Sequence, residues 1–124
     1  MSKSYINPAS GYTQVVTTQY NGLKTIYVSG QVGEGDSLAE QMTDALQNLK
    51  SQLSDAGADF SDIVKMNSYI VDYKPEDLKT FRETRKQIMG DTNMPASTLV
   101  GVSSLALPEW IIEIDAVAVI EAGL

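Results

Sequence analysis

Few folds can accommodate the apolar run Trp110–Ile120 near the end of the chain. It is predicted to be a β-strand, in which successive side chains point to opposite faces of a sheet. One face would carry Trp110, Ile112, Ile114, Ala116 and Ala118, and the other Ile111, Glu113, Asp115, Val117 and Val119. Because both faces are largely aliphatic, this strand has to be covered on both sides.

Two carboxylates, Glu113 and Asp115, stand inside this run. A carboxylate among aliphatic side chains is costly unless it is paired or functional. Glu113 is either a general acid/base or water-orienting group whose pKa is raised by burial, or an interfacial carboxylate that accepts backbone hydrogen bonds without turnover. Asp115 either forms a carboxylate pair with Glu113 or serves independently as a structural residue.

Four further segments are predicted to be strands: Thr13–Gln19, Thr25–Ser29, Ile63–Val71 and Thr98–Val102. The dipeptide Asn21-Gly22 favours a hairpin between the first two. Since Ile63–Val71 shows no strict alternation of apolar and polar residues, we expect it to be buried on both faces.

Two segments carry the signals of helices. Ser37 and Glu40 fit a capping box, in which each side chain accepts a hydrogen bond from the backbone N–H of the other, so a helix is predicted to start at Ser37. Its apolar stripe is formed by Leu38, Met42, Ala45, Leu46, Leu49 and Leu53. Gly57 is placed for a left-handed cap at its end. A second helix is predicted to begin with Pro75 in its first turn and to end at Gly90.

These elements follow the order β-β-α-β-α-β-β. They predict a single domain over residues 1–124, of the α+β class, with two helices packed on one face of a mixed sheet. Two helices can cover only one face, yet the second face of the last strand is still largely aliphatic. An exposed stripe of that kind usually marks an interface. We therefore expect an oligomer with Glu113 and Asp115 at or near the subunit contact.

The composition excludes several classes of site and partner. The chain has no cysteine and no histidine, which rules out thiol nucleophiles, disulfides and Ser–His–Asp catalysis, and neither a metal nor a cofactor is expected. A net charge of −7 repels phosphate backbones, so no nucleic-acid partner is expected. No apolar run approaches the roughly 20 residues of a membrane span, and the N-terminus has no signal-peptide core. We expect a cytoplasmic protein that has no membrane partner.

Short motifs from about Asn7 to Val119 resemble, in order and spacing, those of the Rid family, also called YjgF/YER057c/UK114. They are Gly11-Tyr12-Thr13-Gln14, Tyr27-Val28-Ser29-Gly30-Gln31, Gln47-Asn48-Leu49, Leu53-x-x-Ala56-Gly57-Ala58, Asp62-Ile63-Val64-Lys65 and Glu113-Ile114-Asp115-Ala116-Val117-Ala118. The resemblance implies a chorismate-mutase-like fold and a homotrimer with ligand clefts between subunits. The best-known members hydrolyse reactive enamines and imines.

The same resemblance implies roles for individual residues. In deaminating members, an arginine in the loop Pro-Ala-Arg-Ser/Thr holds the substrate carboxylate, and a closing glutamate helps to orient the hydrolytic water. Here the loop is Pro95-Ala96-Ser97-Thr98, so Ser97 occupies the place of the arginine. By position, Glu113 is the implied catalytic residue, and the implied substrate-binding residues are Tyr12, Ser29, Gly30, Ser97 and Thr98. Tyr12 would wall the cleft or simply cover the core.

The missing arginine leaves two possibilities for the ligand. A guanidinium offers a carboxylate a charged, bidentate contact, whereas a serine hydroxyl offers one neutral hydrogen bond. Either the substrate lacks that carboxylate, or another cation replaces the arginine. Arg82 is the first candidate for such a substrate-binding role, and Arg85 is the second.

Three hypotheses for the function follow. The first is a small-molecule hydrolase related to enamine/imine deaminases, acting in intersubunit clefts on a substrate different from that of the arginine-bearing deaminases. The second is a trimer that binds a metabolite without turnover, as a sensor or carrier. The third is an endoribonuclease or translation inhibitor, which the charge of −7 and the absence of histidine oppose.

Overall fold

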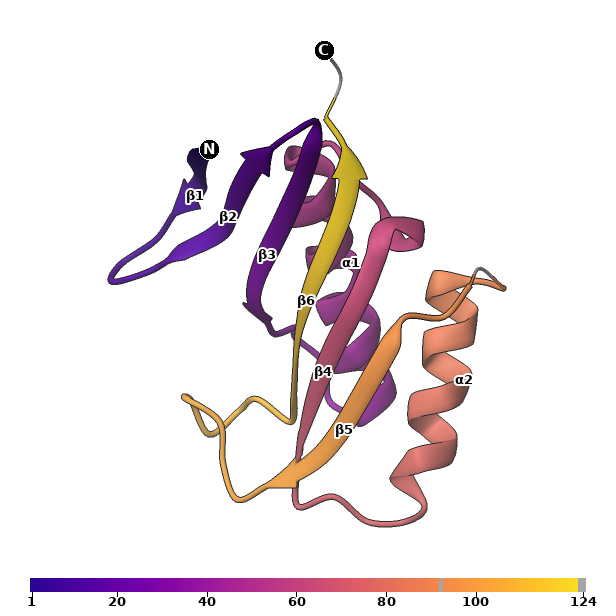
Figure 1. Ribbon diagram of the computed structural model, residues 1–124. Coiled ribbons are helices and arrows are strands. Elements are labelled where there is room, and N and C mark those ends of the chain that lie inside the picture. Colours follow the sequence, from indigo (N-terminus) through magenta and orange to yellow (C-terminus); the bar gives the residue numbers. More distant parts are fainter. Residues whose placement is uncertain (92, 123–124) are drawn as a thin grey trace.

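The computed structural model describes residues 1–91 and 93–122 and places two helices on one face of a β-sheet (Figure 1). In chain order the elements are β1 (Ser2–Pro8), β2 (Thr13–Tyr20), β3 (Leu23–Gln31), α1 (Leu38–Asp55), the 3-10 helix η1 (Phe60–Asp62), β4 (Ile63–Val71), α2 (Asp77–Met89), β5 (Ala96–Val102) and β6 (Ile112–Glu121). The strand order is β1-β2-β3-β6-β4-β5, in which β4 and β5 run parallel and the other neighbours antiparallel. The expected α+β class, with two helices on a mixed sheet, is confirmed.

Strand β1 is an additional strand that the sequence pattern does not predict. It pairs antiparallel with β2, with Tyr5 opposite Val16 and Ile6 opposite Val15. Ile6 is its only residue that is partly buried, and the others are exposed. An edge strand whose side chains face solvent has no apolar alternation, so its sequence carries no periodic signal.

Helix α1 is fixed at both ends largely as predicted. At its start, Ser37 Oγ accepts a hydrogen bond from the Glu40 N–H at 3.1 Å, while Glu40 Oε1 accepts one from the N–H of Asp36, one residue before the expected partner. At its end, Gly57 adopts a φ of +89°, which a residue without a side chain tolerates. The N–H of Ala58 then reaches back to the carbonyl of Leu53, as in a Schellman cap.

Helix α2 begins at Asp77, two residues later than the predicted start at Pro75. Pro75 lies in the turn before the helix, where the N–H of Lys74 donates to Asp77 Oδ2 at 2.9 Å. The helix ends at Gly90, with φ +77°, as predicted. Phe81, Thr84 and Met89 form its buried side.

The core lies between the sheet and the helices. Alternation in the last strand is confirmed, because its inward side chains are at most 2% exposed: Ile112, Ile114, Ala116 and Ala118. The outward side chains are only partly buried and lie on the side of the sheet away from the helices, which we name the open face: Glu113, Asp115, Val117 and Val119. The described part of the chain therefore covers the open face of β6 only in part.

The expectation that Ile63–Val71 is buried on both faces is wrong for the described chain. Met66, Ser68 and Ile70 point into the core, whereas Lys65 and Asn67 remain partly exposed. The pairing with β6 shifts register between Ile63 and Lys65, which interrupts the alternation at the start of the strand. Within the described part of the chain, no helix combines the length and apolar character that crossing a membrane requires.

Candidate functional site

A cavity of about 330 Å³ brings together residues from four separate segments of the chain. Its lining comes from the start of β2, the end of β3, the connection between β5 and β6, and β6 itself: Tyr12, Ser29, Gly30, Val32, Ala106, Trp110 and Glu113. Four of these residues, which sequence analysis singles out as site residues, thus share one cavity: Tyr12, Ser29, Gly30 and Glu113. We refer to it as the Glu113 pocket.

Gly30 allows the carboxylate of Glu113 to lie against the backbone of β3. The pairing of β3 with β6 is irregular between Val28 and Gln31, the interval that contains Gly30. A Cβ atom at position 30 would lie 2.5 Å from Cδ and from Oε2 of Glu113. The side chain of Glu113 therefore occupies the space that any other residue at position 30 would fill.

We predict that Gly30→Ala folds but displaces the Glu113 carboxylate, because its methyl group meets only the end of a flexible side chain. The pKa of Glu113 should then fall towards its ordinary value, measured by NMR titration of the labelled carboxyl carbon. Gly33→Ala is the matched contrast, since its Cβ would lie 2.5 Å from backbone atoms of Gln41 and Ala45 in α1. It should destabilise the fold by about 2 kcal/mol or more. An unchanged Glu113 pKa in Gly30→Ala would contradict the close approach.

The environment of Glu113 favours its neutral form. Its side chain is partly buried, and burial raises the pKa of Glu113, to which the negative charge of Asp115 adds. Asp115 is held in place by β4, because its Oδ1 accepts a hydrogen bond from Asn67 Nδ2 at 3.0 Å and its Oδ2 accepts one from the Tyr69 hydroxyl at 3.1 Å. Asp115 thus has two effects: its hydrogen bonds join β6 to β4, and its negative charge raises the pKa of Glu113.

Polar side chains join the segments that form the wall of the pocket around Tyr12. The Ser29 hydroxyl donates to the carbonyl of Thr13 at 2.7 Å, which ties β3 to β2. Gln31 Nε2 donates to Gln14 Oε1 at 2.7 Å, and Gln14 Nε2 donates to the Tyr12 hydroxyl at 3.3 Å. Tyr12 is nevertheless 53% exposed, so it borders the pocket and does not cover the core.

Trp110 lies in the pocket wall, although the sequence pattern places it on the core face of the last strand. The reason is that β6 begins only at Ile112, so the alternation does not extend back to Trp110. The connection before β6 is held by Gln41, a buried side chain of α1. Its Nε2 donates to the carbonyl of Glu109 at 2.8 Å, and its Oε1 accepts from the N–H of Ile111 at 2.7 Å. The sequence pattern does not indicate a role for Gln41 or Trp110 in this site. The one available signal is that Gln41 is a polar residue beside the apolar stripe of α1.

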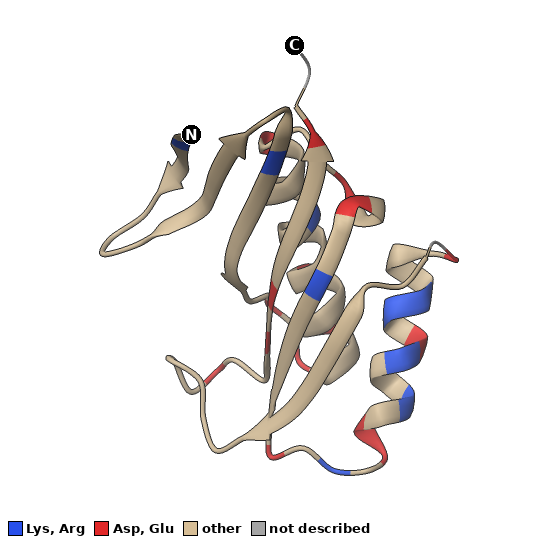
Figure 2. Cartoon of the chain, viewed as in Figure 1, with Lys and Arg blue, Asp and Glu red and all other residues tan. Residues whose placement is uncertain are grey.

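Three of the predicted binding residues lie outside the Glu113 pocket within one chain. Ser97 and Thr98 are exposed on β5, which β4 separates from β6. Thr98 Oγ1 accepts a hydrogen bond from Lys65 Nζ at 2.7 Å. Arg82 lies on α2, whose basic residues Figure 2 shows along the helix, and lines a separate hollow of about 380 Å³ that also includes Arg85.

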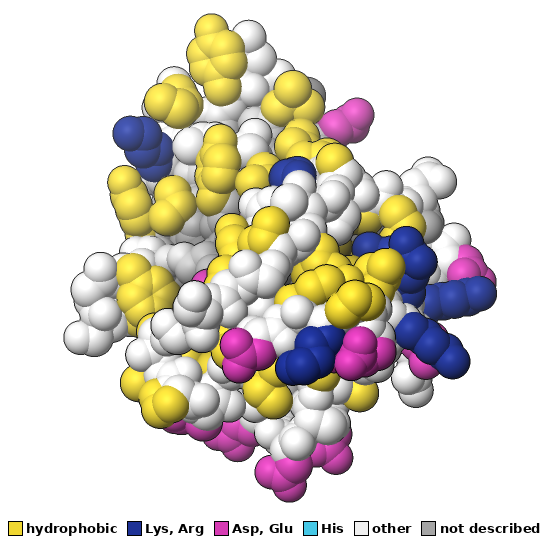
Figure 3. Space-filling model, turned by 90° about the horizontal axis from the view of Figure 1, so that it is seen from below, with side chains coloured by type: hydrophobic (Ala, Val, Ile, Leu, Met, Phe, Trp, Pro, Cys, Tyr) yellow, Lys and Arg dark blue, Asp and Glu magenta, His cyan; other side chains and the backbone are white. Residues whose placement is uncertain are grey.

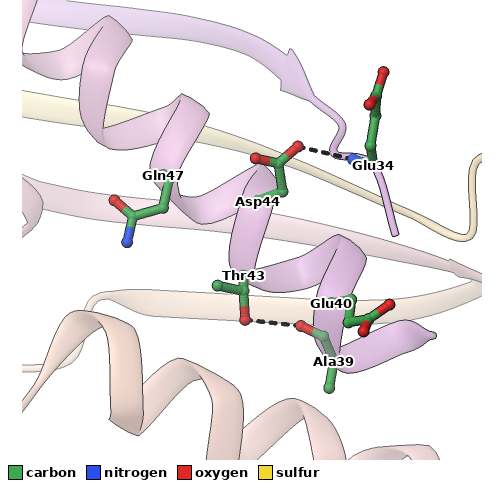
Figure 4. Close-up of a pocket in the computed structure, with 6 residues that line it drawn as sticks. All are labelled: Glu34, Ala39, Glu40, Thr43, Asp44 and Gln47. Carbon is green, nitrogen blue, oxygen red and sulfur yellow. Dashed lines mark hydrogen bonds between the residues drawn. The ribbon is translucent and has the colours of Figure 1, made fainter. Parts of the chain in front are cut away.

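Other hollows and apolar side chains lie on the surface outside the Glu113 pocket. In the view from below, hydrophobic side chains are interleaved with polar ones, and Lys and Arg side chains gather on the side of α2 (Figure 3). A hollow of about 510 Å³ lies beside the first half of α1 (Figure 4), where Asp44 Oδ2 accepts from the N–H of Glu34 at 2.8 Å. Asp44 thereby fastens the segment after β3 to the helix. Within residues 1–91 and 93–122, no three acidic side chains come together as a metal site.

Comparison with known proteins identifies relatives of this chain. The family model described as Endoribonuclease L-PSP matches residues 2–120. A 2-iminobutanoate/2-iminopropanoate deaminase of Homo sapiens is 36% identical over 117 residues, covering 87% of this chain and 79% of that protein. A RutC family protein of Aquifex aeolicus is 32% identical over 120 residues, which cover 90% of each protein.

Solved structures agree with the sequence relatives. The crystal structure of Rv2704 from Mycobacterium tuberculosis, described as a member of the highly conserved YjgF/YER057c/UK114 family, has a TM-score of 0.80 at 28% identity and covers 96% of this chain and 100% of that chain. The crystal structure of yeast Mmf1 also has a TM-score of 0.80, at 24% identity, with coverage of 95% of this chain and 98% of that chain. The second likeness concerns the fold alone.

Proposed function

The chain belongs to the endoribonuclease L-PSP family, also called YjgF/YER057c/UK114 or Rid, and from this premise we propose that it is a small-molecule hydrolase related to imine deaminases. The observation that carries the proposal is the position of Glu113, a carboxylate laid over Gly30 in a pocket with Tyr12 and Trp110. Relatives named as 2-iminobutanoate/2-iminopropanoate deaminases support the reaction type.

The proposed reaction needs a water molecule and one group that acts first as a base and then as an acid. Glu113 accepts a proton from water as the water oxygen bonds to the imine carbon, and it then returns this proton to the nitrogen of the carbinolamine. The carbon–nitrogen bond then breaks, so that an iminium ion and water give a carbonyl compound and an ammonium ion without any change of oxidation state. A raised pKa suits this role, because a carboxylate of higher pKa is a stronger base once it is ionised.

We further propose that the protein acts as a homotrimer with the pockets at subunit contacts. The open face is the support, because Tyr27, opposite the partly buried Val117, is 47% exposed there in a single chain, and Val100 on β5 is 41% exposed. Ser97 and Thr98, on β5, would reach a Glu113 pocket only from a neighbouring subunit. Light scattering of the purified protein should give three times the mass of one chain.

The activity can be tested with imines generated in situ. An amino-acid oxidase supplies imino acids, an amine oxidase supplies imines without a carboxylate, and semicarbazide traps the imine that remains. We expect the assembled protein to accelerate hydrolysis of at least one imine over buffer. If a protein of the correct assembled mass accelerates none of these reactions, the hydrolase proposal is wrong.

Two other functions remain as candidates. Binding without turnover is favoured by one observation, namely that none of the described residues lining the Glu113 pocket is basic. Recovery of an unchanged ligand from the protein, together with inactivity towards imines, would support it. An endoribonuclease is the weakest candidate, because the net charge of −7 repels RNA and the chain has no histidine. RNA cleavage that is lost in Glu113→Gln would favour it.

A further inference from the structure

We propose that the Glu113 pocket selects small cationic ligands, in which an ammonium or iminium group adjoins a compact apolar group, and disfavours carboxylates. The inference rests on the proposed function, since it takes this pocket as the ligand site. It deepens that function by naming the substrate class. The chemistry of the lining, the location of the basic residues and the charge around Glu113 carry it.

The lining of the pocket combines one negative charge with aromatic and aliphatic surface. Glu113 is the only charged residue among the described residues that line it, and Tyr12, Trp110, Val32 and Ala106 form most of the remainder. Aromatic ring faces attract cations, and a carboxylate attracts them more strongly. A volume of about 330 Å³ lies at the lower end of the range for small-molecule sites, so the ligand has to be small.

Within one chain, the basic residues lie away from this pocket. Lys65 donates to Thr98 on the open face at 2.7 Å, and Lys24 donates to a carbonyl at the end of α1 at 2.7 Å. Arg82 lines the separate hollow beside α2. A ligand carboxylate would therefore find no guanidinium or ammonium group of the same chain with which to pair.

The negative charge near Glu113 also favours a cationic ligand over a carboxylate. Asp115 lies two residues further along the same face of β6, and its hydrogen bonds to Tyr69 and Asn67 keep it on that face. A ligand carboxylate would add a third negative charge beside Glu113 and Asp115, in a partly buried site. A cation would instead offset both burial, the main cause of the raised pKa of Glu113, and the smaller repulsion from Asp115.

Three probes of nearly equal shape test this selectivity. Benzylammonium, benzyl alcohol and benzoate differ at the polar end in charge, and Trp110 is the only tryptophan of the chain, so its fluorescence reports on this pocket. In slightly alkaline buffer we expect benzylammonium to bind about tenfold or more tightly than benzyl alcohol, and benzoate to bind most weakly. Glu113→Gln should reduce the affinity for benzylammonium to that for benzyl alcohol. Glu121→Gln, an exposed carboxylate at the end of the same strand, should change none of the three affinities.

Several results would overturn the inference. One is benzoate binding as tightly as benzylammonium, above all if Arg82→Gln or Lys65→Gln then weakens it, because a cation of a neighbouring subunit would complete the pocket. Another is an absence of binding by all three probes up to their solubility limits. Selective cation binding without imine hydrolysis would contradict the proposed function and leave the inference standing. Hydrolysis of imino acids, together with tighter binding of benzoate than of benzylammonium, would contradict the inference and support the proposed function.

Discussion

Glu113→Gln is expected to lower the rate constant for imine hydrolysis by about 10²–10⁴-fold, which is the contribution that a positioned general base commonly makes. Glutamine keeps the size and hydrogen-bonding shape of glutamate but cannot accept a proton. For an uncharged substrate, the loss should therefore fall on kcat while KM changes little. For an iminium substrate, KM should rise as well, because the variant also lacks the negative charge.

The fold should survive this substitution, which makes the activity loss interpretable. The folded-state pKa of Glu113 lies above its unfolded value, because burial and Asp115 both disfavour the charged form. At pH values above both pKa values, the ionised carboxylate therefore reduces stability. This cost declines as pH falls through the folded-state pKa and is gone below the unfolded-state pKa. Glu113→Gln carries no such charge. It should be at least as stable as the parent protein at neutral pH, by thermal unfolding at equal protein concentration.

The pH dependence of the reaction offers an independent readout. A base has to be ionised, so kcat should decline on the acid side around a pKa above that of an ordinary glutamate. Asp115→Asn removes the second cause of that shift while keeping an oxygen that can accept from Tyr69. Its acid limb should move to lower pH. If Glu113→Gln retains more than about one tenth of the parent rate, Glu113 is not the base.

Much of the fold can be predicted from the sequence, because the signals involved are local. Glu113 and Asp115 distinguish the two largely aliphatic faces of the last strand and so indicate which side of β6 faces the helices, and Gly57 and Gly90 mark helix ends through the positive φ that they adopt. Strand β1 is missed because its side chains are exposed and carry no period. The prediction that β4 is buried on both faces fails for a related reason. Apolar as well as polar residues of β4 lie on the open face, so its alternation is weak.

The pocket is only partly predictable for a different physical reason. Ser29, Gly30 and Glu113 are recognisable through a resemblance that spans nearly the whole chain. The approach of Glu113 to Gly30 depends on an irregular pairing of β3 with β6, which no local pattern reports. Trp110 reaches the pocket because β6 starts two residues later than the apolar run suggests, and the side chain that fixes this start comes from α1.

Gln41→Leu is expected to destabilise the protein by about 3 kcal/mol and to shift its melting temperature by roughly 10 °C or more. Gln41 is only 3% exposed, and its amide makes three hydrogen bonds to backbone groups. It donates to the carbonyls of Gly35 and Glu109 at 3.2 and 2.8 Å and accepts from the N–H of Ile111 at 2.7 Å. Leucine has a similar size, so the core stays filled while the three backbone groups lose their partner.

The same substitution should release the connection that carries Trp110, and this separates a loss of hydrogen bonds from a general loss of packing. We expect the Trp110 emission of folded Gln41→Leu to shift to longer wavelength, because the ring becomes more exposed, and the affinity for benzylammonium to fall. Gln47→Leu makes the same chemical change at an exposed position of α1 and should leave both stability and emission close to those of the parent. If Gln41→Leu unfolds at the parent's temperature and its tryptophan emission is unchanged, the connection before β6 must be held by contacts other than the Gln41 amide.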